Sequence, residues 1–504
     1  MQTTMAHARL TILKHHEREL RTWLQGHKEG HERAALVLLR RFRHASQDLT
    51  DSDRYQVVEV HPVPDEWVTS SGPDHVAFPM RHLRPLFQSC EERGLSLGYA
   101  HSHPSGFADF SAQDDQNELA MLQALANRNG PHATLVAILL SSDRWSGRVR
   151  RAAAPEITQS LRHILVVDYP LRIYLGNTSN PTSPHGVDPE VWARQCAALG
   201  EPFQNNVRTL RIGVVGAGGT GGAAITLSAR CGASELVLID PQLLEKTNLN
   251  RVRGARMADV GRKKVEIVRD FVHSLGLDTK VHLEFANVDE SPAAVDALAA
   301  CDVVLGCTDD VLGRSALNAL AYRHGVVVID MGLGGTVAPP AGAKQSSIAN
   351  LRFYQHARIT TLLPGVPGCR CMRCEEVFNE KDLHEATFLR ANPNPTPAQL
   401  KENYITGGMT QAPGVGPFTS AAADYALMQL YDLLQDLRSR RTHPDLRRSS
   451  YNIDFMTMQT SSRAPASAEC ALCHTADSGP PIGLLQDNEL RLGRPALGPL
   501  PRHE

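Results

Sequence analysis

Residues 211–240 read RIGVVGAGGTGGAAITLSARCGASELVLID, and this stretch decides the fold of the larger part of the chain. An apolar run is followed by a glycine-rich turn, a helical stretch to about Cys231 and a second apolar run that ends in Asp240. Such a succession is typical of doubly wound α/β domains, in which backbone N–H groups at the start of the helix bind phosphate. By itself the stretch fits an ATP site and a dinucleotide site equally.

The pattern continues beyond this stretch. Apolar runs at 302–306 and 326–330 predict further parallel strands, and an amphipathic helix is predicted from about Phe418 to Arg438. Residues 375–409 are rich in Asn, Pro, Glu and Lys without clear periodicity, which predicts a surface excursion. We therefore expect one large sheet with a peripheral insertion.

A different domain precedes it. Residues 31–145 contain short β-like runs and a helical stretch after Ser111, which indicate a mixed α/β fold. The segment 176–188 concentrates Gly, Asn, Ser, Thr and Pro and is typical of a connection. The predicted organisation is a first domain at 1–160, a linker at 161–188, a doubly wound domain at 189–474 and a flexible tail at 475–504.

Length and composition set outer limits. At ~150 residues per domain, 504 residues predict about three folding units. With 52 Lys and Arg against 54 Asp and Glu, the net charge of −2 favours neither nucleic acid nor anionic membranes as partners. No apolar run approaches the length of a membrane span, and the polar start MQTTMAHARL lacks a secretory core. We expect a cytoplasmic protein.

The first domain contains a candidate hydrolytic metal site. His101 and His103 follow an apolar run and are two residues apart, so on a strand they point the same way. Asp114, one helical turn after Ser111, can supply a third ligand and leave a fourth position for water. Glu32 is the candidate carboxylate for proton transfer. Taken separately, Ser111 and Asp114 also fit a helix-capping pair, and His-x-His alone is a weak metal signal.

The full spacing His-x-His-x7-Ser-x-x-Asp resembles the JAMM (JAB/MPN+) metalloprotease signature over roughly residues 15–150. The resemblance implies cleavage of peptide or isopeptide bonds after the terminal glycine of ubiquitin-like proteins, or release of groups from sulfur-carrier proteins. The upstream segment EGHERAALVLL departs from that family at Ala35, where a Gly is often found. The resemblance implies a catalytic Zn²⁺ held by His101, His103 and Asp114, with Glu32 as general acid/base and Ser111 as oxyanion stabiliser.

Downstream of the glycine-rich turn, two cations and a carboxylate recur at intervals for which a hydride-transfer enzyme has no need. Cationic side chains can neutralise a triphosphate, and Asp309 at a strand end can hold Mg²⁺. The ordered set resembles the ThiF, MoeB and ubiquitin-activating adenylyltransferases across about residues 189–474. It comprises Asn248-Leu-Asn-Arg251, Gly261-x-x-Lys264, Cys307-Thr-Asp309-Asp310, Arg314 and Asn318.

This resemblance implies a Rossmann-like fold, a homodimer and attack of a protein's terminal carboxylate on the α-phosphorus of ATP. Arg194, within WARQCAALGEPFQ, resembles the Arg that reaches a neighbour's ATP across the dimer. Gln242 is a departure, since relatives usually have a second Asp there. The candidate nucleotide-site residues are Gly216, Gly218, Gly219, Gly221, Asp240, Asn248, Arg251, Lys264 and Asp309.

Ten cysteines are too sparse for a disulfide scaffold. The pairs Cys371-x-x-Cys374 and Cys470-x-x-Cys473 lie about a hundred residues apart, and alone they are only suggestive of metal binding. Relatives in the adenylyltransferase superfamily carry two such pairs and bind a structural Zn²⁺. The resemblance therefore implies a closed site of four thiolates.

Many ubiquitin-activating relatives pass the acyl group to a cysteine, but none occurs here between Cys374 and Cys470. Two hypotheses follow. The protein stops at the adenylate and a partner takes the acyl group, or a hydroxyl such as Thr410, Thr419 or Ser420 forms an oxyester. A hydroxyl needs a base to act as nucleophile, which favours the first hypothesis. Cys369 is a weaker candidate for a thioester.

The combined prediction is a bifunctional enzyme that uses ATP to adenylate the terminal glycine of a ubiquitin-like protein and cleaves bonds made to that terminus. Bacterial ubiquitin-like conjugation systems with antiviral roles offer an analogy, and a ubiquitin-conjugating-like enzyme is a further candidate partner. The first alternative is a sulfur-carrier adenylyltransferase whose adenylate becomes a thiocarboxylate. The second is a binding scaffold with degenerate sites.

Overall fold

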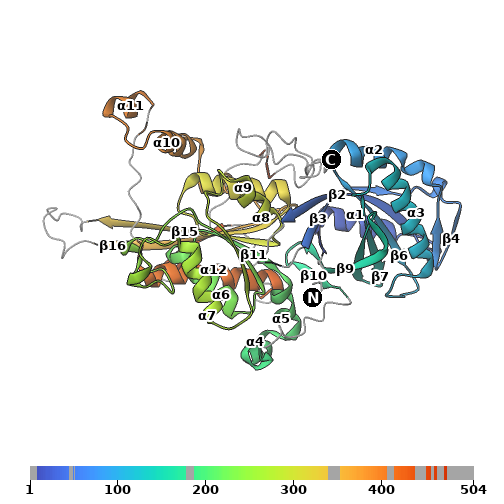
Figure 1. The fold of residues 1–504 in the computed structure, drawn as a ribbon, viewed down its shortest axis with the longest axis horizontal. Helices are drawn as coiled ribbons and strands as arrows, with labels where there is room; N and C mark the ends of the chain where they lie inside the picture. Colours follow the sequence, from blue (N-terminus) through green and yellow to red (C-terminus); the bar gives the residue numbers. More distant parts are fainter. Residues whose placement is uncertain are drawn as a thin grey trace.

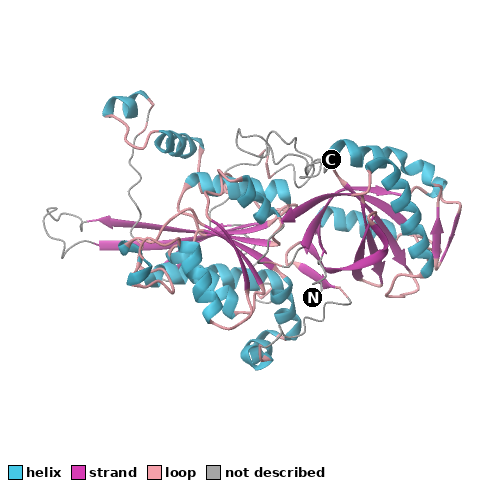
Figure 2. Cartoon of the chain, viewed as in Figure 1, coloured by secondary structure: helices cyan, strands magenta, loops and turns pink. Residues whose placement is uncertain are grey.

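The computed structural model describes residues 8–44, 49, 52–176, 187–338, 352–403, 405, 414–437, 450–455, 459–461, 470 and 472–473. Within them the chain forms two domains that lie side by side, each built round an eight-stranded sheet (Figure 1). Helices cover both faces of the sheet in the second domain (Figure 2). Among the described helices, none is long and apolar enough to cross a membrane.

The sheet of the first domain closes on itself, because β1 pairs with both β3 and β9. The strand order is β1-β3-β2-β6-β7-β8-β9-β10, and β4 and β5 form a separate hairpin. The elements are β1 (Ala8–Leu13), α1 (Lys14–Leu24), β2 (Ala34–His44), β3 (Ser52–Pro62), η1 (Asp65–Trp67), β4 (Ser70–Gly72), β5 (His75–Ala77), η2 (Met80–Leu83), α2 (Arg84–Arg93), β6 (Ser96–His103), α3 (Ala112–Asn129), β7 (Thr134–Ser141), β8 (Arg144–Arg151), β9 (Ala154–Val167) and β10 (Arg172–Leu175).

Central strands of this sheet are buried on both faces. Every residue of β7 is buried, as expected of a continuous apolar run without alternation. Alternate residues of β2 and β7 enter two separate apolar clusters, one on the side of α1 and one under α2 and α3. The predicted strands at 34–39, 95–100 and 135–140 therefore lie at the centre of the domain, and the second of them continues as the strand that carries the histidines.

The second domain consists of η3 (Pro189–Trp192), α4 (Ala193–Leu199), α5 (Glu201–Thr209), β11 (Arg211–Val215), α6 (Gly219–Arg230), β12 (Glu235–Ile239), η4 (Lys246–Asn248), η5 (Met257–Asp259), α7 (Lys264–Ser274), β13 (Lys280–Glu284), α8 (Pro292–Ala299), β14 (Val303–Gly306), α9 (Val311–His324), β15 (Val327–Ala338), β16 (Arg352–Leu362), α10 (Glu380–Ala391), α11 (Pro397–Glu402), α12 (Gly416–Gln435), β17 (Ser450–Asp454) and β18 (Gln459–Ser461). The predicted strands and the long helix are confirmed in their positions.

The order of the strands places a ligand site after β11. Strands β13, β12, β11, β14 and β15 run parallel, and β16 to β18 continue the sheet in antiparallel fashion. β11 leads along the chain to β12 on one side, whereas its other neighbour, β14, comes much later. In open α/β sheets a ligand binds at the carboxyl end of the strands where the order reverses in this way. The glycine-rich turn occupies that position.

Two predictions about connections have different outcomes. The excursion predicted at 375–409 is confirmed over Glu380–Ala391 and Pro397–Glu402, since α10 and α11 bury none of their residues and stand away from the sheet in Figure 1, whereas Phe378 is buried. The linker predicted at 161–188 is wrong for its first half. β9 continues to Val167 and β10 pairs with it in the first sheet, so the first domain extends to residue 175. The apolar run ILVV at 164–167 is part of β9, which the Gly and Pro further on obscured.

The two domains share buried polar contacts. Arg54 of β3 is fully buried and donates to the carbonyl oxygens of Ala299 (2.8 Å), His324 (3.0 Å) and Gly325 (2.8 Å), where α8 and α9 end. The last carbonyls of a helix lack intrahelical partners and carry partial negative charge, so this cation stabilises both ends. A side chain of the first domain therefore caps the C-terminal ends of two helices of the second.

A buried ion pair reinforces this boundary. Arg9 of β1 lies 2.6 Å from Asp302, and neither side chain is more than 2% exposed. Asp302 also accepts from the backbone N–H of Arg211 (2.8 Å) and lies 3.2 Å from the ring of His163. Apolar residues of the first domain, including Leu165 and Val167, belong to the same buried cluster as β11 and β12. The domains thus form one body with a continuous core.

Candidate functional sites

The three predicted metal ligands of the first domain converge. The His101 Nε2 atom lies 3.0 Å from Asp114 Oδ1, and His103 Nε2 lies 3.4 Å from Asp114 Oδ2. One ligand atom from each of the three residues lies within 4.8 Å of the others. Glu32 Oε1 is 3.6 Å from His103 Nε2. The four side chains are at most 4% exposed as residues, so the group is buried.

Neighbouring strands and one helix cap hold this group in place. β6 presents both histidines on one face, and Ser102 between them faces the other way and binds Arg33 through two hydrogen bonds of 3.1 and 3.2 Å. Those bonds bring Glu32 beside the histidines. Ser111 caps α3 in a capping box with Asp114, and its hydroxyl donates to Asp114 Oδ2 at 2.8 Å. The hydrogen bonds that cap α3 therefore also position the carboxylate of Asp114.

The carboxylates and His103 shift one another's pKa, and although burial acts to lower the pKa of His103, contacts with Asp114, Phe107 and Glu32 raise it. Burial acts to raise the pKa of Asp114, but hydrogen bonds from the two histidines hold it well below its usual range. Burial raises the pKa of Glu32 to about 8, with Asp114 adding to the effect and His103 opposing it. Two carboxylates in so small a buried space repel each other unless a positive charge lies between them.

The fit to a metal ion can be tested on His101. Both of its ring nitrogens are buried, and apart from the contact of Nε2 with Asp114 Oδ1 at 3.0 Å they have no partner within the described residues. Buried polar atoms nearly always have a partner, and neutral imidazole is a common metal ligand, so the ring of His101 fits that role. His103 differs in that its Nδ1 atom lies 3.0 Å from the carbonyl oxygen of Phe107, the outer contact that orients ligating histidines. The residues fit a three-ligand site.

Two hollows flank the group. One, of about 300 Å³, is lined by Glu32 and by residues of the β4–β5 hairpin and its approach. The other, of about 270 Å³, is lined by Ser102 and His103. Glu32 borders the first hollow and His103 borders the second, so the group can be reached from both.

In the second domain the glycine-rich turn is built for close backbone approach. Gly216 has φ of +96°, and a Cβ atom there would lie 2.6 Å from the carbonyl oxygen of Cys307. A Cβ atom on Gly221 would lie 1.8 Å from the carbonyl oxygen of Gly216. Gly218, by contrast, has no atom within 4 Å of its Cβ position, so it borders open space at the start of α6. The turn leaves room for phosphate where the N–H groups of α6 are free.

Asp240 anchors the turn from the adjacent strand. Its Oδ2 accepts from the N–H of Ala217 at 2.6 Å, and its Oδ1 accepts from the N–H of Gln242 at 2.7 Å. Burial raises the pKa of this carboxyl. Gln242, the departure seen in the sequence, accepts from Lys264 Nζ at 2.6 Å. The Gln242 amide carries no charge to offset the Lys264 cation, which also acts on the nearby Asp240 carboxyl and lowers its pKa.

The remaining predicted nucleotide-site residues are distributed round this turn. Arg251 lies against it, because a Cβ atom on Gly219 would be 2.9 Å from the Arg251 side chain. Asp309 is exposed after β14 and acts to raise the pKa of Asp240, which places the two carboxylates within electrostatic range. Asn248 is buried, and its Oδ1 accepts from the N–H of Glu245 at 3.1 Å, a structural role. Arg194 is exposed on α4.

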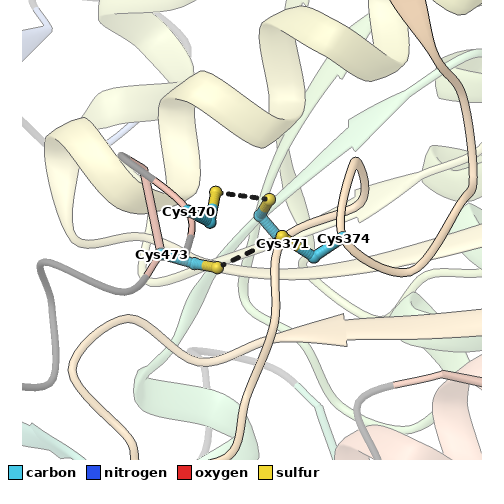
Figure 3. A group of neighbouring side chains, drawn as sticks. All are labelled: Cys371, Cys374, Cys470 and Cys473. Carbon is cyan, nitrogen blue, oxygen red and sulfur yellow. Dashed lines mark hydrogen bonds between the residues drawn. The ribbon is translucent and has the colours of Figure 1, made fainter. Parts of the chain in front are cut away.

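The four paired cysteines come together although they lie about a hundred residues apart (Figure 3). The sulfur atoms of Cys371 and Cys470 are 3.8 Å apart, and those of Cys374 and Cys473 are 3.7 Å apart. Four thiolates at ~2.3 Å from a tetrahedral zinc ion would be ~3.8 Å from one another. The hydrogen bond from Cys371 lowers the pKa of Cys473, whereas that contact and burial raise the pKa of Cys371 and burial raises the pKa of Cys374, so among these three the thiolate is favoured at Cys473. The geometry fits a closed four-sulfur site.

The hydroxyl candidates differ in what the structure says of them. Thr410 lies outside the described residues. Thr419 is buried and its hydroxyl donates to the carbonyl oxygen of Gly416 at 2.9 Å, so it is engaged within α12. Sequence reasoning missed the stacked pair His27 and His31 beside the first site. Their signal was the density of histidines just before Glu32.

Comparisons with known proteins bear on the second domain. The model of the ThiF family matches residues 192–475. The SAMP-activating enzyme E1 of Haloferax volcanii is 30% identical over 174 residues, which are 34% of this chain and 57% of that protein. The molybdopterin-synthase adenylyltransferase of Escherichia coli is 34% identical over 192 residues, which are 38% of this chain and 69% of that protein.

Among solved structures, E. coli MccB with MccA-N7isoASN is 16% identical, with a TM-score of 0.43, and the alignment covers 57% of this chain and 76% of that chain. The chain spans a little over half the length of the first curated relative. The family match covers more than half of the 504 residues. It coincides with the doubly wound domain and its glycine-rich turn. The chain belongs to the ThiF family.

Proposed function

We propose that the second domain adenylates the terminal glycine carboxylate of a ubiquitin-like or sulfur-carrier protein. The carboxylate oxygen attacks the α-phosphorus of ATP, and pyrophosphate leaves with the electron pair of the broken P–O bond. The open turn at Gly218, at the reversal of strand order, supports this most directly. Two of the curated relatives are named as an activating enzyme and an adenylyltransferase.

The chain's residues would act mainly by positioning and by neutralising charge, since the reaction needs little acid or base chemistry. Lys264 and Arg251 lie next to the turn and offer two cations to the phosphates. Asp309 is the residue that would hold Mg²⁺, which shields phosphate charge when bound. The exposure of Arg194 supports its contribution to a neighbouring chain's site in a homodimer.

We propose in addition that the first domain, residues 8–175, is a JAMM-type hydrolase that cleaves peptide or isopeptide bonds after the carrier's terminal glycine. His101, His103 and Asp114 would hold a zinc ion, which when bound activates water and polarises the scissile carbonyl. Glu32, buried beside His103, would move the proton from the water to the leaving nitrogen. Ser111 now donates to Asp114, so a role at the oxyanion requires its hydroxyl to turn.

The cysteine group would hold a second, structural zinc ion. All four sulfur ligands come from the chain, which leaves no position for water and no catalytic role. It would join the segment after β16 to the residues near 470, close to the middle of α9, where Asn318 accepts from the N–H of Met372 at 2.8 Å. Its expected contribution is to the folding of the second domain.

The fate of the adenylate separates the remaining alternatives. Release to a partner, such as a ubiquitin-conjugating-like enzyme, fits the absence of cysteine between Cys374 and Cys470. An oxyester on Thr410 or Ser420 is the competing hypothesis. An adduct that survives thiols and is lost in mild hydroxide supports the oxyester, and no adduct supports release. A thiocarboxylate mass shift with a sulfur source supports sulfur transfer. A protein adduct supports conjugation, the chemistry of the antiviral systems that offer the analogy.

The experiment that tests the proposal combines two assays on one purified chain. Carrier-dependent ATP–pyrophosphate exchange reports the first activity, and cleavage of the same carrier extended beyond its terminal glycine reports the second. We expect Asp309→Ala to abolish exchange and to leave cleavage intact, and His103→Ala to do the reverse. Loss of both activities in either variant, with the protein folded, contradicts independent sites.

A further inference from the structure

A histidine outside the metal group lies where the two hollows meet. His27 lines both the hollow that contains Glu32 and the one that contains His103, and among the described residues it is the one that does so. It is partly exposed and follows α1 in the loop that leads to Glu32. A ligand that occupies either hollow can therefore contact this ring.

The loop determines which ring nitrogen of His27 carries a proton. Its Nδ1 atom accepts from the backbone N–H groups of Glu29 (3.2 Å) and His31 (3.3 Å). A nitrogen that accepts two N–H groups is unprotonated, so the neutral ring carries its proton on Nε2. No described residue accepts from Nε2. His27 thus offers one neutral N–H donor to the hollows.

A second histidine restrains the ring. His31 stacks on His27 with ring centroids 4.7 Å apart and planes within 7°. The Nδ1 atom of His31 lies 3.2 Å from the hydroxyl of Ser71 on β4. The stack is tied to the hairpin on one side and to the loop of Glu32 on the other. A donor held by packing loses little freedom when it binds a ligand.

We propose that His27 is a specificity-determining residue of the hydrolytic site, where its Nε2–H donates to a backbone carbonyl oxygen of the carrier's extended tail. The inference rests on the proposed hydrolytic function. A glycine-rich tail has no side chains to recognise, so its peptide groups must be recognised instead. A neutral donor suits an uncharged carbonyl, and it adds no positive charge that would retain the free carboxylate that cleavage produces. Arg33, the nearby cation, is paired with Asp65 at 3.1 Å.

The test separates the donor from the loop-forming role of the same ring. In His27→Asn the side-chain oxygen can accept from the following N–H groups as in an Asx turn, but the shorter side chain loses the Nε2–H donor. His27→Ala loses both. His61→Asn is the matched control, since His61 lies in β3 outside both hollows. The zinc-loaded full chain is assayed with a peptide ending in Gly-Gly that is amide-linked to aminocoumarin.

We expect His27→Asn to raise KM about three- to tenfold, the value of one hydrogen bond, with kcat within about twofold and zinc content unchanged. The control should match the wild type. An unchanged KM in His27→Asn overturns the inference, even if His27→Ala is impaired, because the ring would then only shape the loop. A loss of zinc or of kcat alone also overturns it. No cleavage by the zinc-loaded wild type would instead overturn the hydrolytic function and this inference with it.

Discussion

Removal of the Asp302 carboxylate is the most informative perturbation of the domain boundary. Asp302→Ala leaves the guanidinium of Arg9 buried with its ionic partner gone, although the Ala300 carbonyl oxygen still accepts from it. It also removes the acceptor for the N–H of Arg211. Loss of one member of a buried ion pair typically costs 3–5 kcal/mol, and here the buried charge of Arg9 keeps only weaker compensation, such as the electrostatic effect of Glu235.

A cost of about 4 kcal/mol corresponds to a shift of about a thousandfold in the folding equilibrium. Denaturant unfolding measures it, with intrinsic fluorescence as the probe. Trp145 is buried in the first domain and Trp192 in the second, so both domains report. Because Arg9 and Asp302 join one continuous core, we expect a single transition whose midpoint falls in the variant. Asp270→Ala is the control, because that exposed pair should contribute at most about 1 kcal/mol.

The reasoning would be refuted by either of two results. A loss below about 1 kcal/mol would mean that the charge of Arg9 is solvated in the folded protein. Separate transitions for the two domains in the wild type would mean that the boundary does not couple them. The double variant Arg9→Met with Asp302→Leu should recover part of the loss, because an apolar pair of similar size leaves no unpaired charge.

Three further predictions concern other parts of the second domain. Cys371→Ser should lower the zinc content by one ion per chain in metal analysis, whereas Cys90→Ser should not; unchanged zinc would contradict the four-sulfur site. Gly221→Ala should weaken ATP binding at least about fivefold in calorimetry, because the added methyl would lie 1.8 Å from a carbonyl oxygen, and equal affinity to Gly222→Ala would count against it. Burial acts to raise the pKa of Glu235, but Arg211 and Arg162 lower it to about 2. The contribution of Glu235 to the free energy of unfolding is therefore present above pH 4.5 and is lost as the pH falls towards 2. Over this pH range the unfolding free energy of the wild type should fall by about 3 kcal/mol through this group, whereas that of Glu235→Gln should not show this fall. Denaturant titration at each pH measures the difference.

The fold of the second domain was predictable because its signals are local. The strand, turn and helix of residues 211–230 follow one another in the chain, and each has its own pattern. The boundary at residue 160 was wrong because β9 is completed by β10 and by its pairing with β1, which lies some 150 residues earlier. Neither contact leaves a sign in the sequence around 161–175.

The candidate sites follow the same division. The positions of His101, His103 and Asp114 could be predicted, because a strand and a helix cap set their directions. The partner of Lys264 could not, since the Gln242 amide meets it only through the fold. The same holds for Arg54, whose acceptors come from two helices of the other domain. Buried polar contacts between distant segments require the tertiary structure.

The central claim is that one chain activates a carrier's terminal carboxylate at the turn after β11. The most direct measurement is ATP–pyrophosphate exchange with a carrier ending in glycine, compared with the same carrier lacking that glycine. We expect exchange only with the complete carrier, and we expect Lys264→Met to lose that exchange. Exchange that ignores the terminal glycine, or that survives Lys264→Met at the wild-type rate, would contradict it.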